Sequence, residues 1–178
     1  DGRTLATSSD DRTVALWDVT DPTRPHLTGP PVQAHARPVR SLRDASVGEA
    51  IRAARTCYDH LAGRLGIELA VALERNDVLV HDGQTYVLGA AAADRLGRLG
   101  IDVDELARGR RPLVRSCLDW SERRPHVAGA LGAALAARLL ELGWIKRRAG
   151  NRSVEITPIG RTRLRAELGV SVSAERAA

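Results

Sequence analysis

The sequence lacks several residue types and patterns, and each absence narrows the class of protein. Its 178 residues include no Phe, no Met and a single lysine, Lys146, so 26 of the 27 cationic residues are arginine. Two cysteines, Cys57 and Cys117, are too few for a disulfide framework. No apolar run approaches the roughly 18 to 20 residues of a membrane span, and no basic-then-apolar leader opens the chain. Together with the GC-rich codons behind its many Arg, Ala and Gly residues, these absences predict a cytoplasmic bacterial protein with no membrane partner.

Catalytic signatures are also missing, which bears on the functional class. The chain contains no nucleophile elbow, no phosphate-binding loop and no paired acid–base motif, so we predict that it is not an enzyme. Apolar residues at 43% and charged residues at 28% are typical of a globular protein. The net charge of +5 permits a nucleic-acid partner without requiring one.

Residues 1–42 differ in composition from the rest of the chain. They are rich in Ser, Thr, Asp and Pro, and two short runs, Thr4–Thr7 and Thr13–Trp17, predict strands. The Asp-Gly-Arg-Thr-Leu-Ala opening and Leu-Trp-Asp at 16–18 resemble one blade of a WD-repeat β-propeller, and Ala34-His35 resembles the start of a second. Propeller closure needs at least about four blades, so we expect this segment not to fold independently. As an alternative function, the chain is a fragment of a WD-repeat interaction scaffold with an unrelated tail.

The remainder of the chain contains an internal repeat. HLAGRLG at 60–66 and HVAGALG at 126–132 share five of seven residues at an offset of 66, and each is followed by a hairpin pattern and a short helix. Chance similarity between Ala/Leu/Gly-rich helices is the alternative. The repeat predicts an α+β, mainly helical fold of two tandem winged-helix-like units, each helix–hairpin–helix. The predicted units span 43–104 and 105–172, with a tail at 173–178.

A family resemblance covers about residues 39–172. Arg-Thr-Cys-Tyr-Asp-His-Leu-Ala-Gly at 55–63, Cys-Leu-Asp-Trp-Ser-Glu-Arg-Arg at 117–124 and the Thr157-Pro158 ending resemble the C-terminal part of a two-domain group of ArsR-type bacterial transcriptional regulators. In those proteins an N-terminal winged helix-turn-helix domain reads the operator, and here the propeller-like segment occupies its place. The resemblance implies a fragment of a DNA-binding regulator, mainly its dimerisation or effector-sensing part, acting as a homodimer.

A basic hairpin in the second unit is the predicted DNA contact. The preceding helix offers no side-chain donor between Gly129 and Arg138, so it is unsuited to reading base edges. Cationic hairpin residues can contact phosphates, which adds affinity but no sequence information. We therefore predict weak, largely non-specific DNA binding, with a solvated basic turn as the alternative. The predicted contact residues are Lys146, Arg147, Arg148 and Arg152.

Cysteine and histidine recur together in the two units. Cys57 and His60 are three residues apart and are expected on one helix face, and Cys117 and His126 are their approximate repeat mates. Two thiols and two imidazoles suit zinc or another thiophilic metal ion. The alternative is that the cysteines are small buried residues and the histidines make structural hydrogen bonds.

Charged residues follow the second cysteine. Asp119 and Glu122 with Arg123 and Arg124 predict an ion-pair cluster at a helix start, where carboxylates are favoured. Binding of a small anionic effector by these arginines is the functional alternative.

Overall fold

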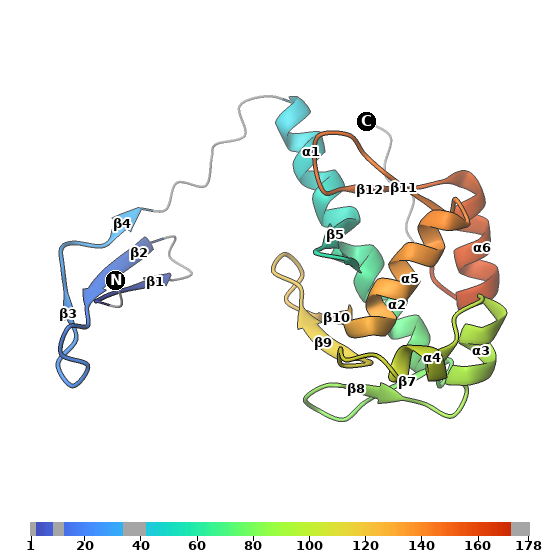
Figure 1. Ribbon diagram of the computed structural model, residues 1–178. Coiled ribbons are helices and arrows are strands. Elements are labelled where there is room, and N and C mark those ends of the chain that lie inside the picture. Colours follow the sequence, from blue (N-terminus) through green and yellow to red (C-terminus); the bar gives the residue numbers. More distant parts are fainter. Residues whose placement is uncertain (1–2, 9–12, 34–41, 172–178) are drawn as a thin grey trace. The chain divides into compact units, whose positions relative to one another are not determined.

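A computed structural model describes residues 3–8, 13–33 and 42–171 (Figure 1). The chain divides into two compact units, residues 1–44 and 45–178, and each is described by itself. The sequence that resembles the start of a second blade, Ala34-His35, and the predicted tail at 173–178 lie outside the described residues.

The first unit contains an antiparallel sheet in which β2 is the central strand. Its strands are β1 (Thr4–Ser8), β2 (Thr13–Asp18), β3 (His26–Leu27) and β4 (Val32–Gln33). β1 occupies one edge of β2, while β3 and β4 both pair with the other edge. The indole Nε1 of Trp17 donates a hydrogen bond to Thr7 Oγ1 at 2.8 Å. The two predicted strands are therefore present, and assignment to a WD-repeat blade stays a prediction.

Helix α1 (Leu42–Ala53) begins just before the boundary at residue 44, and most of it belongs to the second unit. The first repeat consists of β5 (Arg55–Cys57), β6 (His60–Ala62), α2 (Gly63–Arg75), β7 (Leu79–His81), β8 (Tyr86–Leu88) and α3 (Ala92–Arg98). The linking helix α4 (Val103–Ala107) leads to the second repeat, which consists of β9 (Arg115–Leu118), β10 (Pro125–Ala128), α5 (Gly129–Glu141), β11 (Ile145–Arg147), β12 (Val154–Ile156) and α6 (Pro158–Leu168). Each repeat thus consists of a hairpin, a helix, a second hairpin and a second helix, in that order.

The predicted fold class was wrong in its proportions and in its repeat unit. Of the residues that the structure describes, 38% are helical and 26% lie in strands, so the fold is not mainly helical, and each repeat begins with a hairpin that the prediction lacked. Leu61, Leu65 and Leu69 follow one another at helical intervals, a spacing that favours one helix over all three. In the structure Leu61 lies on β6, and only the other two belong to α2. An apolar strand leading directly into an amphipathic helix mimics one continuous helical pattern.

A glycine marks each junction between strand and helix. Gly63 and Gly129 open α2 and α5 with φ of +73° and +86°, a left-handed conformation that side chains with a Cβ rarely adopt. A Cβ at Gly63 would also lie 2.5 Å from the backbone oxygen of Arg52. The chain can therefore turn sharply from β6 into α2, and from β10 into α5, only because these positions carry no side chain.

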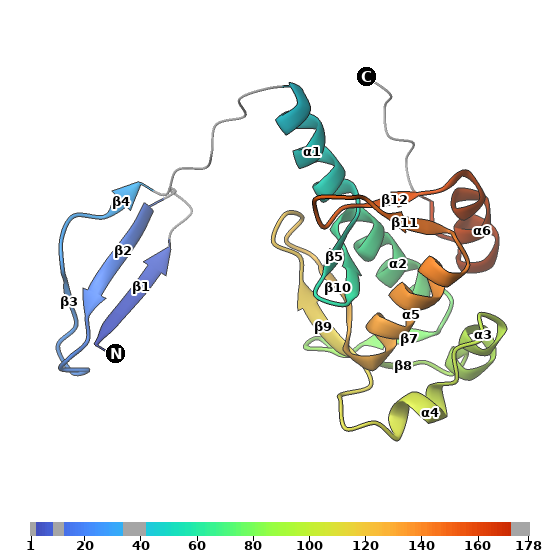
Figure 2. The ribbon, with the colours of Figure 1, turned by 45° about the horizontal axis from the view of Figure 1, so that its top comes forward.

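One hydrophobic core serves both repeats. Leu65, Leu69 and Leu73 on α2 and their repeat mates Leu131, Leu135 and Leu139 on α5 are all buried, as the repeat alignment predicted. Figure 2 shows α2 and α5 in the middle of the unit, with β7–β8 on one side and β11–β12 on the other. In the described residues, no helix combines the length and the apolar character that a membrane crossing requires.

The last helix begins as its sequence predicts. Thr157 is the N-cap of α6, and its hydroxyl accepts a hydrogen bond from the backbone N–H of Gly160 at 2.9 Å. Pro158 takes the first helical position, where a missing N–H costs nothing. The start of α6 fixes the end of the β11–β12 hairpin, because the Thr157 hydroxyl also donates to the Gly143 carbonyl at 2.8 Å.

Candidate metal centre and basic hairpin

Each repeat places a cysteine directly opposite a histidine in its first hairpin. Cys57 on β5 pairs in register with His60 on β6, and Cys117 on β9 pairs with His126 on β10. The expectation that Cys57 and His60 share a helix face was therefore wrong, since both lie on strands. The second histidine comes later in the sequence because residues 119–124 form a longer connection between β9 and β10.

The two hairpins bring these four residues together at one point. One possible ligand atom from each residue, sulfur or ring nitrogen, lies within 4.8 Å of the other three. The rings of His60 and His126 stack with their centroids 5.1 Å apart and an interplanar angle of 29°. Both histidines are buried, whereas Cys57 and Cys117 are half-buried and border the solvent. The structure thus assembles the complete set that the sequence singled out as a metal site.

Glycines on the helices allow this approach. His126 Cβ would lie 3.6 Å from a Cβ added to Gly66 of α2, and His60 Cβ would lie 3.2 Å from one added to Gly132 of α5. Each histidine therefore packs beneath the helix of the other repeat. The small residues of these helices permit a close neighbour, and that neighbour lies within the same chain.

Burial shifts the pKa values of two members of this cluster, His126 and Cys117. Burial disfavours the charged imidazole of His126, and together with the adjacent His60 it lowers the pKa of His126 to about 4. Burial also raises the pKa of the Cys117 thiol, and the neighbouring Cys57 raises it further. Near neutral pH, His126 is consequently an uncharged imidazole, which is the form that binds metal ions.

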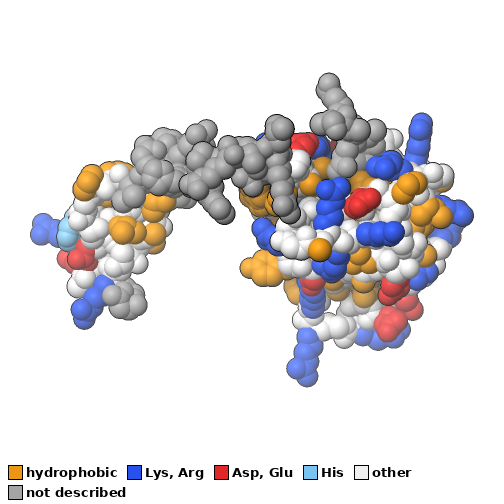
Figure 3. Space-filling view, turned by 90° about the horizontal axis from the view of Figure 1, so that it is seen from above, with side chains coloured by type: hydrophobic (Ala, Val, Ile, Leu, Met, Phe, Trp, Pro, Cys, Tyr) orange, Lys and Arg blue, Asp and Glu red, His pale blue; other side chains and the backbone are white. Residues whose placement is uncertain are grey.

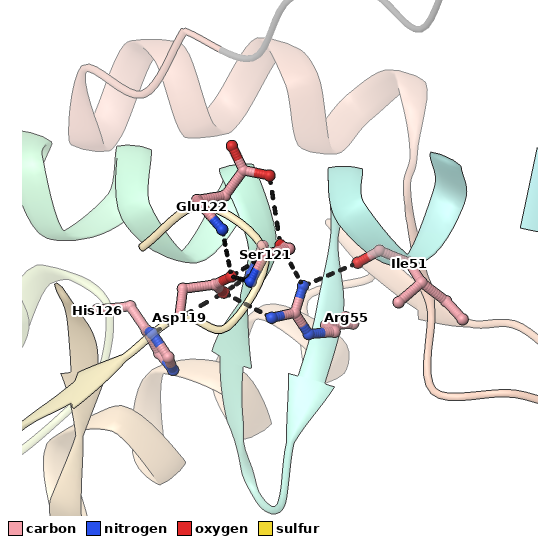
Figure 4. A network of polar contacts seen from close by, with 7 residues as sticks. Ile51, Arg55, Asp119, Ser121, Glu122 and His126 are labelled. Carbon is pink, nitrogen blue, oxygen red and sulfur yellow. Dashed lines mark hydrogen bonds and ion pairs between the residues drawn. The ribbon is translucent and has the colours of Figure 1, made fainter. Parts of the chain in front are cut away.

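Beside the cluster lies a buried ion pair that the sequence analysis missed. Arg55 Nη2 donates to Asp119 Oδ2 at 2.8 Å, and these side chains are 1% and 0% exposed (Figure 4). Arg55 Nη1 also donates to the Ile51 carbonyl of α1 and to Ser121 Oγ. The ring of Trp120 lies over the guanidinium at 4.5 Å. Arg55 therefore ties the first hairpin to α1 and to the turn of the second hairpin.

Asp119 is held as a carboxylate by the groups around it. It accepts hydrogen bonds from the backbone N–H of Gly63 at 2.6 Å and from the N–H and hydroxyl of Ser121. Burial opposes ionisation, but these bonds and the one from Arg55 outweigh it and hold the pKa of Asp119 well below its usual range. Figure 4 shows the Asp119 carboxylate pointing toward Arg55 and Ser121, and its Oδ2 is also 4.0 Å from His126 Nδ1.

The location predicted for this charged cluster was wrong. Residues 119–124 form the turn between β9 and β10 rather than a helix start, and the ion pair of Asp119 is with Arg55, 64 positions earlier. Sequence spacing gives no signal for such a distant partner.

A second carboxylate contacts the other histidine. Asp59 Oδ1 lies 3.3 Å from His60 Nδ1, and Arg111 donates to Asp59 Oδ2 at 2.5 Å. The hydrogen bond from Arg111 is the main reason that the pKa of Asp59 falls to about 2. Each histidine of the cluster thus has an aspartate near its Nδ1, and each aspartate is held by an arginine from the other repeat or from the link between them.

The basic hairpin β11–β12 lies in the same unit but contributes nothing to the Cys/His cluster. Lys146, Arg147 and Arg152 are exposed and Arg148 is half-buried. Lys146 pairs in register with Glu155, so one acidic residue is interspersed among the cations. The hairpin also joins the first repeat, because Thr56 N–H donates to the Arg152 carbonyl at 2.9 Å.

Helix α5 is unsuited to entering a DNA groove. One side of it is buried along its whole length, including Gly129, Leu131, Gly132, Leu135, Ala136 and Leu139. Arg138, its first side-chain donor, is already engaged: Nε donates to the Leu99 carbonyl at 2.7 Å and Nη1 pairs with Glu141 at 3.1 Å. The expectation of no base reading by this helix agrees with its burial.

Additional exposed arginines occur on α6. Arg161 and Arg165, four residues apart, border a shallow hollow with Thr162 and Ala166. On the face drawn in Figure 3, blue basic side chains are spread over the unit 45–178 with red acidic side chains between them.

Comparison with known proteins gives one informative relative. The chain is 38% identical over 134 residues to the uncharacterized HTH-type transcriptional regulator YdfF of Bacillus subtilis (strain 168). The match covers 75% of this chain and 59% of the relative, so the chain spans somewhat more than half of the relative's length. No family model matches the chain, and no solved structure matches it significantly. Over those 134 residues, the chain is thus homologous to an HTH-type transcriptional regulator.

Proposed function

We propose that this chain is part of a DNA-binding transcriptional regulator and that residues 45–171 form mainly its dimerisation or effector-sensing part. The observation that carries this proposal is the 38% identity to an HTH-type regulator over 134 residues. The proposed role is regulatory rather than enzymatic. It places the protein in the bacterial cytoplasm, where the DNA is.

The proposed DNA contact is the β11–β12 hairpin, acting on the phosphate backbone. Exposed Lys146, Arg147 and Arg152 can reach phosphates, while the buried face and engaged Arg138 of α5 leave that helix without a donor for base edges. Arg148 completes the proposed set of contacts. Binding through phosphates alone is weak, tolerant of sequence and strongly salt-dependent.

The test is binding of the full chain to a random DNA duplex over a range of salt concentrations. The variant Lys146→Ala/Arg147→Ala should weaken binding and lower the slope of log K against log [salt] by about two, because each phosphate contact contributes roughly 0.9. The matched control is Arg108→Ala/Arg110→Ala, which removes the same charge from exposed positions in the link between the repeats. Equal effects of the two variants would contradict a contact by the hairpin.

The proposed homodimer requires an exposed surface, and hairpin tips provide a candidate. Tyr58, Leu118 and Trp120 are 94%, 69% and 61% exposed, although all three are large and apolar. Sedimentation of the full chain should give twice the monomer mass, and Leu118→Ser should shift the equilibrium toward the monomer. A monomer at concentrations well above micromolar would contradict this part of the proposal.

A further inference from the structure

We propose that the two first hairpins form a four-coordinate binding site for one thiophilic divalent cation of the Zn²⁺ class. The ligands are Cys57, His60, Cys117 and His126. The inference deepens the proposed regulatory function by naming the effector, and it rests on that function only for the effector role. Its test requires no DNA.

The donor set and its geometry favour zinc. Two sulfur and two nitrogen ligands are one of the common sets of structural zinc sites, which are tetrahedral and closed. With bonds of about 2.0–2.3 Å, tetrahedral ligand atoms lie roughly 3.3–3.8 Å apart. The 4.8 Å limit here is about 1 Å wider, a difference that small side-chain rotations about χ1 and χ2 can remove. The half-buried cysteines provide a path for the ion from solvent.

Unpartnered ring nitrogens are the second, independent observation. His60 Nε2, His126 Nδ1 and His126 Nε2 are buried and have no hydrogen-bond partner. A buried polar atom without a partner costs about 1–3 kcal/mol, and such atoms are rare in native proteins. A cation bound to one nitrogen of each ring would provide a partner for two of these three nitrogen atoms.

The aspartates beside the rings indicate which nitrogens bind. Metal-binding histidines usually donate their second ring N–H to a carboxylate, which fixes the tautomer and the ring orientation. Asp59 occupies that position for His60 Nδ1 at 3.3 Å, and Asp119 approaches His126 Nδ1 at 4.0 Å. The Nε2 atoms are therefore the ligands. A ring shift that brings His126 Nδ1 to Asp119 would satisfy the third unpartnered nitrogen.

Charge and protons balance in this site. Both thiols lose their protons on binding, so two protons are released and two thiolates neutralise the dication. The bound cluster is neutral overall, which suits its burial. Because each repeat supplies one sulfur and one nitrogen, the ion would join the two hairpins across their interface.

The experiment is a Co²⁺ titration of the full chain, treated first with a chelator and kept under a thiol-free reductant. We expect saturation at one equivalent, with the visible bands of tetrahedral cobalt and a thiolate charge-transfer band, and displacement by one equivalent of Zn²⁺. Cys57→Ser and Cys117→Ser should each reduce the charge-transfer band to half or less and weaken binding at least tenfold. The control His81→Gln alters an exposed histidine of β7 and should leave the titration unchanged.

A second measurement covers the case in which a cysteine variant fails to fold. In the unsubstituted chain, one equivalent of Zn²⁺ should slow alkylation of both thiols at least tenfold, as counted by mass. Unchanged alkylation rates, or a cobalt spectrum without thiolate bands, would overturn the inference in favour of simple buried cysteines. Absence of metal binding with intact salt-dependent DNA binding overturns this inference alone. Loss of DNA binding with intact metal binding overturns only the proposed function.

Discussion

His60 and His126 stack ring against ring, with centroids 5.1 Å apart, although 66 residues separate them in the sequence. Each is followed by the same Ala-Gly pair two residues later, and each packs against a glycine of the helix that follows its partner. This contact is the centre of the repeat interface.

The interface glycines should not tolerate a methyl group. In Gly66→Ala the new Cβ would lie 2.5 Å from the Leu61 carbonyl oxygen, and in Gly132→Ala it would lie 2.6 Å from that of Val127. We expect each variant to lose about 1–3 kcal/mol of unfolding free energy, the usual cost of overpacking, in urea denaturation. The control Gly97→Ala lies in α3 with nothing within 4 Å and should gain about 0.5–1 kcal/mol. Equal changes in unfolding free energy in all three variants would contradict the close packing at Gly66 and Gly132.

Breaking the buried ion pair should be costly. Arg55→Met leaves the Asp119 carboxylate buried without its charged partner, and we expect a loss of about 3–5 kcal/mol of unfolding free energy. The exposed pair of Arg98 with Asp94 is the matched control, and Arg98→Met should change stability by no more than about 1 kcal/mol. Urea denaturation of both variants is the measurement. A near-neutral Arg55→Met would show that the pair is not buried in solution.

Asp59 should act as a positioning residue for the cation. Asp59→Asn keeps the shape of the side chain but weakens its hold on His60 Nδ1, so Zn²⁺ affinity should fall about 10–100-fold. The stoichiometry and the tetrahedral cobalt spectrum should persist, which separates positioning from loss of a ligand. Asp94→Asn, on the exposed face of α3, serves as control. Unaltered affinity in Asp59→Asn would remove this aspartate from the site.

The boundary between the two units should be the first place that proteases cut. We expect limited digestion to cleave between about Asp21 and Ala45 and to leave a stable C-terminal core, since Arg24 is exposed and the units separate at residue 44. Mass spectrometry of the products locates the cuts. A chain truncated to residues 42–178 should unfold at the same urea concentration as the full chain. Protection of residues 1–38 under these conditions would contradict an independent C-terminal core.

Local sequence patterns predicted some parts of this fold well and missed others for a physical reason. The two β-strands at residues 4–8 and 13–18, the Thr157 cap and the Leu positions of α2 and α5 follow from alternation, capping and helical spacing. The β5–β6 hairpin was missed because its three-residue strand continues the leucine spacing of α2. A positive φ at Gly63, which marks the true boundary, leaves no trace in hydrophobic periodicity.

The candidate site, like the fold, was predicted from the sequence only in part. The repeated Cys/His pair in the sequence pointed to the four residues that the structure brings together, because repeat mates occupy equivalent places in paired units. Arg55 was not identified, since its partner Asp119 is fixed only by the packing of one hairpin against another. Burial of a charged residue is a property of the assembled interface, and no residue near Arg55 in the sequence indicates it.

The packing of each histidine beneath the helix of the other repeat is also relevant to the origin of this unit. A single hairpin–helix module carrying one cysteine and one histidine would leave its histidine exposed and its glycine face uncovered. Two separate copies related by a two-fold axis would cover both, with Gly66 and Gly132 occupying one ancestral position. The reciprocal contacts of the two histidines in this chain are those that two copies of one module would make with each other. The linker containing α4 joins the two repeats, and the connection between β9 and β10 is longer than the one between β5 and β6.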